Sequence, residues 1–331
     1  MLPSSHAFDT AFPALIRGAA LALPIAAAWL LWLRRPPRDR ERAAMLAASA
    51  WLLPALLAVN RLALQQGWWR FEAEGGMLWG IPVDLLIGWV LLWGVLPVLA
   101  LPRTHPALLL LLCLGLDLLY MPRLEPVLLL GRAWWAGEAS ALALALLPAL
   151  CLARWTQRER RLVGRALLLV GAFAGCFVWL IPSLALEADG RSWSALLAGP
   201  PWRISLRLQV LALPALLGLA AVQEFVQRGR GTPLPTDPPR LLVASGLYRY
   251  LRNPMQLALV LLWLLLAIVL RSPTLALAAG VAWAYCAGLA HWSESADMER
   301  RFGAAWNRYR RAVPAWFPRR GPWVAAADAA A

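Results

Sequence analysis

The feature that most constrains this chain is the recurrence of long apolar stretches along its whole length. A helix rises about 1.5 Å per residue, so about 17–25 apolar residues cross a hydrocarbon core of roughly 30 Å. Hydrophobic residues make up 61% of the chain, whereas soluble domains contain about 45–50%. The sequence therefore predicts an all-α fold, that of a polytopic transmembrane helical protein.

Hydropathy predicts nine membrane spans. They cover residues 14–33, 43–62, 77–101, 106–121, 138–154, 163–185, 205–226, 256–270 and 273–292. The fourth span is short, and the Pro- and Trp-containing stretch 121–137 that follows it is also typical of a re-entrant or interfacial segment. Counts of eight or ten spans stay open as alternatives.

Arginine placement predicts the topology. The net charge is +14, the chain contains no Lys, and Arg is concentrated in four connections, at 34–42, 154–165, 228–252 and 300–320. Alternating spans bring all four to one side, which the positive-inside rule makes cytoplasmic. We therefore expect the N-terminus outside and the C-terminus in the cytoplasm. The first 13 residues carry no Lys or Arg, so the first span is expected to be retained rather than cleaved as a signal peptide.

Composition also limits the expected partners. Arg without Lys, in a chain rich in Ala, Leu, Gly and Pro, is typical of a GC-rich bacterial genome, so we expect a bacterial inner membrane. The Arg residues flank apolar spans and no nucleic-acid-binding module is visible, which favours anionic lipid headgroups over nucleic acid as partners. No metal site or disulfide is expected, because the four cysteines lie inside spans without CxxC spacing or nearby His. These are Cys113, Cys151, Cys176 and Cys286.

The Pro- and Gly-rich connection 227–253 divides the chain, because its prolines forbid a continuous helix. We expect an N-terminal multi-span region at 1–223 with no assigned role, a catalytic unit at 224–320 and a flexible tail at 321–331. Two spans cannot close a cavity alone, so the seventh span must pack against them. Helical spacing of Met298, Phe302 and Tyr309 predicts an amphipathic helix over 291–309.

Several enzyme classes lack their motifs in this sequence. The three histidines are far apart, and no HExxH, GxSxG, P-loop or strand-borne GxGxxG occurs, which argues against metalloproteases, serine hydrolases and nucleotide hydrolysis. Methyl transfer from a sulfonium needs few side chains, because the donor is already activated and the site mainly holds donor and acceptor aligned and dry.

Polar residues crowd the start of the eighth span. Tyr248, Arg249, Tyr250, Arg252, Asn253 and Gln256 lie there. Glu294 follows the ninth span, and a hairpin brings these two ends together. Tyr and Arg at such a boundary are also typical of interfacial anchors and topology signals.

The order of these residues resembles the isoprenylcysteine carboxyl methyltransferase and phospholipid N-methyltransferase superfamily, over about residues 224–320. Its G-x-Y-x-x-x-R-[HN]-P-x-Y signature matches at Gly246, Tyr248, Arg252, Asn253 and Pro254. Its E-E-x-x-L-x-x-x-F-G-x-x-[YW]-x-x-Y signature matches at Glu294, Met298, Phe302, Gly303, Trp306 and Tyr309.

The resemblance implies a membrane methyltransferase that uses S-adenosylmethionine and takes a lipid, isoprenoid or other hydrophobic acceptor from the bilayer. It also implies a cofactor pocket at the cytoplasmic ends of the helices, with Glu294 toward the polar end of the donor. The implied cofactor-binding residues are Leu241, Leu242, Val243, Gly246, Tyr248, Arg252, Asn253, Pro254, Met255, Gln256 and Glu294.

The chain departs from the family pattern at three positions. Gln256 replaces a Tyr, Ser295 replaces a second Glu, and Ala290 stands where the eukaryotic enzymes place an Arg that holds the prenylcysteine carboxylate. An acceptor other than a prenylcysteine is therefore expected. With Glu294, His291 is a candidate catalytic residue that could orient or deprotonate an acceptor, because its ordinary pKa of about 6.5 suits proton transfer; an interfacial role is the alternative.

Two other functional classes stay open. Membrane sterol and steroid reductases, which use NADPH, have C-terminal tails of similar pattern, but the Arg-Asn-Pro sequence at 252–254 favours the methyltransferase. A non-catalytic protein with a degenerate methyltransferase fold would also accommodate Gln256 and Ser295.

Charged residues inside the N-terminal spans are a separate signal. Arg17, Asp84, Asp117 and Glu138 lie within or at the ends of apolar stretches, where an unpaired charge costs at least about 2.5–3.5 kcal/mol. Asp84 and Asp117 are candidates for an acceptor site or for a structural polar pair, while Glu138 also suits an interfacial position. Both interpretations of the two aspartates are kept.

Overall fold

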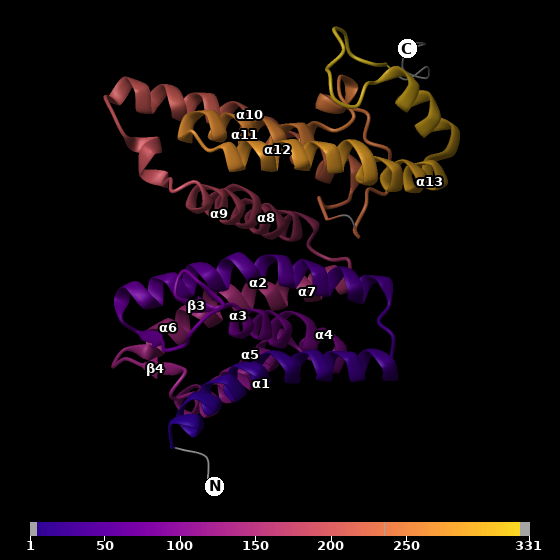
Figure 1. Cartoon of the computed structure of the whole chain (residues 1–331). Helices are drawn as coiled ribbons and strands as arrows, with labels where there is room; N and C mark the ends of the chain where they lie inside the picture. Colours follow the sequence, from indigo (N-terminus) through magenta and orange to yellow (C-terminus); the bar gives the residue numbers. More distant parts are fainter. Residues whose placement is uncertain (1–4, 235, 325–331) are drawn as a thin grey trace. The chain divides into compact units, whose positions relative to one another are not determined.

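The structure is a computed structural model that describes residues 5–234 and 236–324, and it divides into two compact units, 1–176 and 177–331. Apolar helices dominate both units (Figure 1). This spatial division falls earlier than the border at 223–224 that we expected from the position of the motifs.

In the first unit α2 is the central helix. It packs against α3, η1, α6, η3, α7 and α8. Small residues of α2, such as Ala43, Ala44 and Ala47, are fully buried and let these helices approach closely. The helices are α1 (Ser5–Arg34), α2 (Asp39–Gln66), α3 (Val83–Val90), η1 (Leu91–Val95), α4 (Leu96–Ala100), α5 (Pro106–Tyr120), η2 (Met121–Arg123), α6 (Trp134–Ser140), η3 (Ala141–Leu146), α7 (Leu147–Gln157) and α8 (Leu162–Phe173).

One end of the first unit gathers its two Arg clusters. Arg40 pairs with Glu159 at 2.5 Å, and the Arg154 guanidinium donates to the carbonyl oxygens of Leu101 and Pro102. The connections 34–39, 100–106 and 157–162 therefore share an end, as alternating spans require.

The other connections carry the short strands. β1 (Trp69–Phe71) pairs antiparallel with β4 (Leu128–Leu130), and β2 (Met77–Leu78) pairs with β3 (Ile81–Pro82). The predicted start of the third span at residue 77 was wrong, because 77–82 form this hairpin and the helix begins at Val83. Residues 124–133 are not helical and include β4, so this stretch is a folded connection between α5 and α6.

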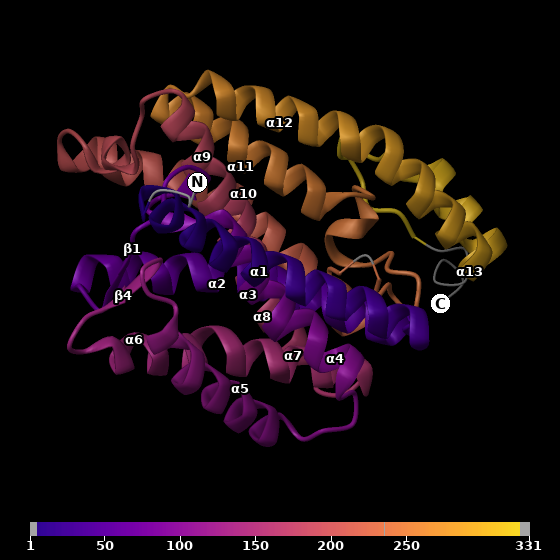
Figure 2. The ribbon, with the colours of Figure 1, turned by 60° about the horizontal axis from the view of Figure 1, so that its bottom comes forward.

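In the second unit α10, α11 and α12 lie side by side (Figures 1 and 2). The seventh span, in α10, thus packs against the following hairpin, and Trp263, Leu266 and Leu275 are buried in the core. The elements are η4 (Ala174–Leu180), which carries the border between the units, α9 (Ile181–Ala188), η5 (Trp193–Leu197), α10 (Pro201–Gly229), η6 (Gly246–Arg249), α11 (Pro254–Leu270), α12 (Pro273–Tyr285), η7 (Cys286–Ala290) and α13 (His291–Ala312).

Eight helices in the described residues are long and apolar enough to cross a membrane. The helix that corresponds to the eighth predicted span, α11, is apolar but has 17 residues, about 25 Å at the usual rise. Length and composition therefore support a helical multi-pass membrane protein.

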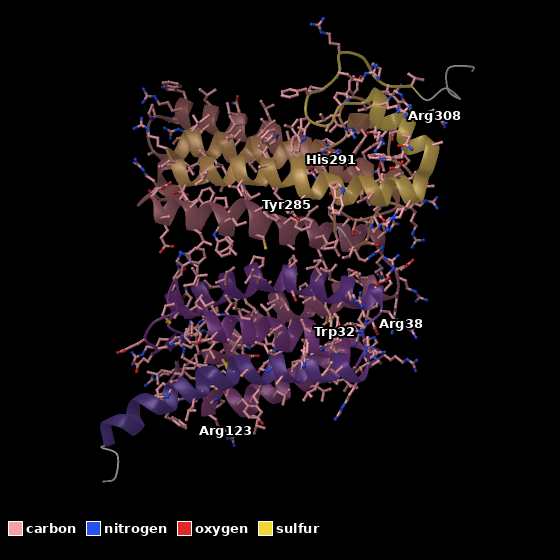
Figure 3. All side chains as sticks on the ribbon, turned by 45° about the vertical axis from the view of Figure 1, so that its right-hand side comes forward. Trp32, Arg38, Arg123, Tyr285, His291 and Arg308 are labelled. Carbon is pink, nitrogen blue, oxygen red and sulfur yellow. The ribbon has the colours of Figure 1, made fainter. Side chains whose placement is uncertain are left out.

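The helix predicted over 291–309 is bent. Within α13, Gly303 has φ 49° and ψ −123°, which a helix cannot contain. Figure 3 labels Tyr285 at the end of α12, His291 at the start of α13 and Arg308 in the part of α13 after Gly303. The expected helix is thus present, as His291–Ala312, and is divided at Gly303, whose backbone conformation a hydropathy pattern does not record.

Candidate functional site

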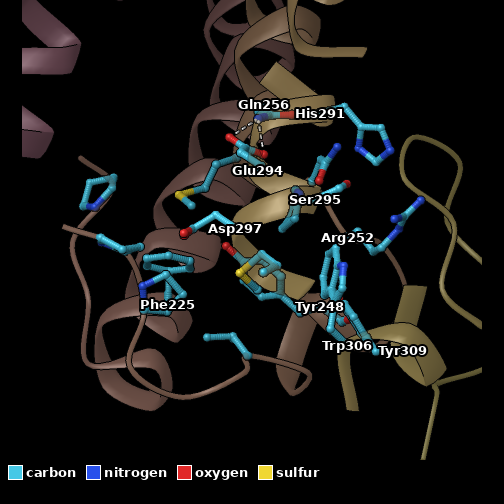
Figure 4. Close-up of a pocket in the computed structure, with 18 of the residues that line it drawn as sticks. Phe225, Tyr248, Arg252, Gln256, His291, Glu294, Ser295, Asp297, Trp306 and Tyr309 are labelled. Atoms are coloured by element: carbon cyan, nitrogen blue, oxygen red, sulfur yellow. Dashed lines mark hydrogen bonds between the residues drawn. The ribbon is translucent and has the colours of Figure 1, made fainter. Parts of the chain in front are cut away.

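A pocket of about 410 Å³ opens in the second unit where α10, α11 and α13 meet (Figure 4). The lining comes from the end of α10, the loop after it, η6, the start of α11 and α13. Its members are Phe225, Thr232, Pro233, Leu234, Pro238, Pro239, Val243, Tyr248, Arg252, Asn253, Pro254, Met255, Gln256, His291, Glu294, Ser295, Asp297, Met298, Arg300, Trp306 and Tyr309.

The turn at η6 brings Tyr248 into the pocket wall. Gly246 has φ 54°, and a Cβ there would lie 2.9 Å from the carboxyl carbon of Glu224. Glycine therefore permits both the left-handed backbone and the close approach of α10. Tyr248, 5% exposed, packs on Phe225 with ring centroids 6.3 Å apart.

The loop after α10 closes on itself through two buried residues that sequence reasoning missed. The Thr232 hydroxyl donates to the Asp237 carboxylate at 2.9 Å, and the Thr232 N–H donates to the Asp237 carbonyl at 3.1 Å. These two hydrogen bonds close the loop whose Pro233, Pro238 and Pro239 form an apolar wall of the pocket. A Thr and an Asp five residues apart among prolines are typical of a side-chain-closed turn, and that signal could have identified the loop.

The polar end of the pocket joins α11 to α13. The Gln256 amide donates to both Glu294 oxygens at 3.3 and 3.4 Å. Burial raises the pKa of Glu294 above its ordinary value, and the Gln256 hydrogen bond partly opposes that rise. Burial, together with the nearby Arg252 and Arg310 cations, lowers the pKa of His291, which favours the neutral imidazole.

Several buried polar atoms of the pocket lining have no hydrogen-bond partner within the described residues. The donors are Arg252 Nε, Asn253 Nδ2 and Trp306 Nε1, and the acceptor is Gln256 Oε1. A buried polar atom without a partner costs about 1–3 kcal/mol, so such atoms are rare unless a ligand or water completes them. Four of them in one pocket make it a candidate site for a polar ligand.

Residues 232–305 match the phospholipid methyltransferase family. This matches the superfamily expected from the two signatures in the C-terminal third. No curated protein and no solved structure matches the chain in the other comparisons. The match favours a methyltransferase over a reductase.

The matched segment, residues 232–305, contains most of the pocket. Of the residues expected to bind cofactor, Val243, Tyr248, Arg252, Asn253, Pro254, Met255, Gln256 and Glu294 line it, and His291 lines it too. Three others lie outside the lining. Leu241 is 53% exposed, Leu242 packs against Trp306 and Tyr309, and Gly246 shapes the turn.

Some lining residues were not among the expected site residues, notably Phe225, before the matched segment 232–305, and Asp297, within it. Phe225 lies on α10, outside both signatures, so no motif pointed to it. Asp297 occupies an unspecified position of the second signature, three residues after Glu294, and that helical spacing could have suggested a shared face.

The two candidate aspartates of the first unit have other surroundings. Asp84 accepts from Arg17 Nε at 2.7 Å, and Arg17 also donates to the carbonyl oxygens of Glu74 and Gly75. Asp117 and Glu138, 7% and 3% exposed, interact with each other. Each aspartate is thus paired inside the first unit, Asp84 with a cation and Asp117 with a second acid. Neither lines the pocket of the second unit.

Proposed function

We propose that the second unit is a membrane-embedded methyltransferase that uses S-adenosylmethionine. The observation that carries the proposal is the pocket, whose lining combines apolar walls with unpartnered donors and a carboxylate. A zwitterionic ligand with a flat apolar part is complementary to such a lining.

The residues present fit this cofactor. Glu294 and Gln256 Oε1 would accept from its ammonium group, and Arg252 Nε, Asn253 Nδ2 and Trp306 Nε1 would donate to its carboxylate. Phe225, Tyr248 and the loop prolines offer apolar surfaces to the adenine. A volume of about 410 Å³ lies within the roughly 300–1,000 Å³ usual for small-molecule pockets.

When bound, S-adenosylmethionine would supply an activated methyl group: the bond from its sulfonium sulfur to the methyl would break as the acceptor bonds the methyl, with a neutral thioether as the leaving group. The chain's own residues contribute binding and alignment, worth several orders of magnitude in rate when the reacting atoms are held in contact. Glu294 and Arg252 fix the two charged groups, and the apolar wall at Val243 and Met255 excludes water. The neutral imidazole of His291 would take the proton from a thiol or amine acceptor.

The acceptor we propose is a hydrophobic molecule from the bilayer, such as a lipid or isoprenoid. The pocket lies at the end of helices long and apolar enough to span a membrane, so an apolar acceptor would reach it without leaving the lipid. Ala290 carries no charge that could hold the carboxylate of a prenylcysteine.

The site would face the cytoplasm of a bacterial cell, where the cofactor is made. In the second unit the Arg clusters 228–252 and 300–320 share an end with the pocket, since Arg249 and Arg252 bond to Trp323 and Pro314. The positive-inside rule places such an end in the cytoplasm. Exposed arginines there, together with Phe317, which is 82% exposed, would contact anionic headgroups.

The test is to incubate membranes that contain the protein with methyl-labelled S-adenosylmethionine and to extract the lipids. We expect label in a lipid fraction, lost in Glu294→Ala and Asn253→Ala and retained in the control Glu299→Ala, whose side chain lies outside the pocket lining. Equal label in all samples and in membranes without the protein would reject the proposal.

A further inference from the structure

The last described residues run alongside η6 and the residues that follow it. We call residues 314–323 the return segment; it begins after the end of α13 and lies outside the matched stretch 232–305. The Arg252 N–H donates to the Pro314 carbonyl at 3.0 Å, the Arg319 N–H to the Tyr250 carbonyl at 3.1 Å, and the Trp323 N–H to the Arg249 carbonyl at 2.9 Å. The last residue of η6 and the backbone that follows it are thus bonded to the return segment.

Side chains reinforce these backbone bonds. Arg249 Nε donates to the Trp323 carbonyl at 2.8 Å, and the Tyr309 hydroxyl donates to the Tyr248 carbonyl at 2.7 Å. The Trp323 ring packs edge-on against Tyr309 with centroids 5.4 Å apart, and Tyr309 packs on Trp306 at 5.7 Å. Tyr309, 2% exposed, therefore joins the return segment to the pocket wall.

The turn needs these partners because a single 3-10 turn leaves most of its backbone polar groups without partners of its own. Residues 246–249 form a single 3-10 turn, followed by residues 250–253, which lie outside any helix or strand. Backbone polar groups that are withdrawn from water must find partners, and the return segment supplies them at residues 249, 250 and 252. The same backbone carries Tyr248, Arg252 and Asn253 into the pocket.

We infer that the return segment is a positioning element of the cofactor site, and that Trp323 is its principal positioning residue. Trp323 does not line the pocket; it acts by holding Arg249 and Tyr309, and through them the orientation of Arg252 and Asn253. This inference rests on the proposed function for the identity of the ligand but not for the contacts themselves.

The experiment compares four variants of the full-length protein in detergent by S-adenosylmethionine calorimetry and steady-state kinetics. Trp323→Ala removes the ring that packs on Tyr309 but keeps the backbone bonds of residue 323, whereas a chain ending at Val313 removes the whole return segment. Trp316→Ala is the matched control, because Trp316 packs on Trp283 at 6.2 Å rather than on the turn. A chain ending at Val324 keeps every contact described for the return segment.

We expect Trp323→Ala to raise the Kd and the KM for the cofactor about tenfold, and the chain ending at Val313 to raise them further. The kcat at saturating cofactor should change less than threefold, and the two controls should stay within twofold of the parent. Hydrogen exchange of the Arg252 amide should quicken in the shortened chain, while the amides of α10 and α11 stay protected.

Unchanged cofactor affinity in Trp323→Ala, with an unchanged exchange rate at Arg252 in the chain ending at Val313, would overturn the inference. Should that shortened chain lose its helical circular dichroism, Trp323→Ala alone decides, with Trp323→Phe expected to restore most of the affinity. A parent protein that binds no S-adenosylmethionine would refute the proposed function instead. The Arg252 exchange rate would still test whether the return segment holds the backbone after η6.

Discussion

The amide of Gln256 donates to both carboxylate oxygens of Glu294, at 3.3 and 3.4 Å, and so joins the start of α11 to the start of α13. Gln256 is one of the positions at which the chain departs from the expected family pattern. The departure therefore leaves a direct partner for the pocket carboxylate, and Gln256 Oε1 remains unpartnered beside it.

Glu294→Gln should weaken cofactor binding about 10- to 100-fold, because it removes a charge-assisted hydrogen bond worth about 1.5–3 kcal/mol. Calorimetry with S-adenosylmethionine measures the change. Glu299→Gln is the control, since Glu299 bonds Asn307 and pairs with Arg310 away from the pocket lining. Equal losses in both variants would mean that Glu294 has no specific role.

Cofactor affinity should depend on pH through Glu294. Because desolvation by the surrounding pocket raises the pKa of this carboxyl group, and the ammonium group of the ligand needs the ionised form, affinity should fall on acidification at a higher pH than for a fully solvated Glu. Gln256→Leu removes the hydrogen bond that lowers this pKa, so the fall should begin at a still higher pH. Kd values between pH 5 and 8 measure both curves, and a flat profile in the parent protein would contradict the assignment.

Gly303→Ala should destabilise the second unit by about 1–2 kcal/mol, because an L side chain is strained at φ 49°. It should also weaken cofactor binding, since the bend sets the position of Trp306. Gly280→Ala is the matched control: Gly280 has helical backbone in α12 and open space around its Cβ position. Thermal unfolding in detergent should show a loss of several degrees for Gly303→Ala and none for Gly280→Ala.

Asp84→Asn should lower the stability of the first unit by about 1–3 kcal/mol, because it removes the carboxylate that pairs with Arg17 at 2.7 Å. The cofactor Kd should stay unchanged, because Asp84 does not line the pocket. Thermal unfolding and calorimetry on one preparation separate the two effects. Asp39→Asn, at a 98% exposed side chain, should be neutral. A Kd that changes with Asp84→Asn would support the acceptor-site interpretation of this residue instead.

Anionic phospholipid should stabilise the protein relative to zwitterionic phospholipid. Arg308, Arg311 and Arg320 are exposed and have no ionic partner in the described part of the chain, and each is worth about 1 kcal/mol near an anionic surface. Replacing all three with Gln should remove most of the difference in Tm between nanodiscs of the two lipids. A triple variant that keeps the full difference would exclude this contact.

The local rules of helix length and hydropathy were sufficient for much of the fold. Apolar stretches located the helices, and the Pro-rich connection located the start of α11, because both depend only on neighbouring residues. The helical hairpin of the eighth and ninth predicted spans also brought the residues around Gln256 close to Glu294, since two antiparallel helices return to the same end.

The tertiary structure decided what distant residues do to one another. Hydropathy could not show that Gly303 bends α13, that Arg17 rather than another group pairs with Asp84, or that Thr232 and Asp237 close a loop. It also classed residues 321–331 as a flexible tail; 325–331 lie outside the described residues, whereas Trp323 is bonded to Arg249. Such contacts depend on exact backbone directions in three dimensions, which a pattern of apolar and charged residues does not encode, whereas the membrane spans follow from that pattern alone.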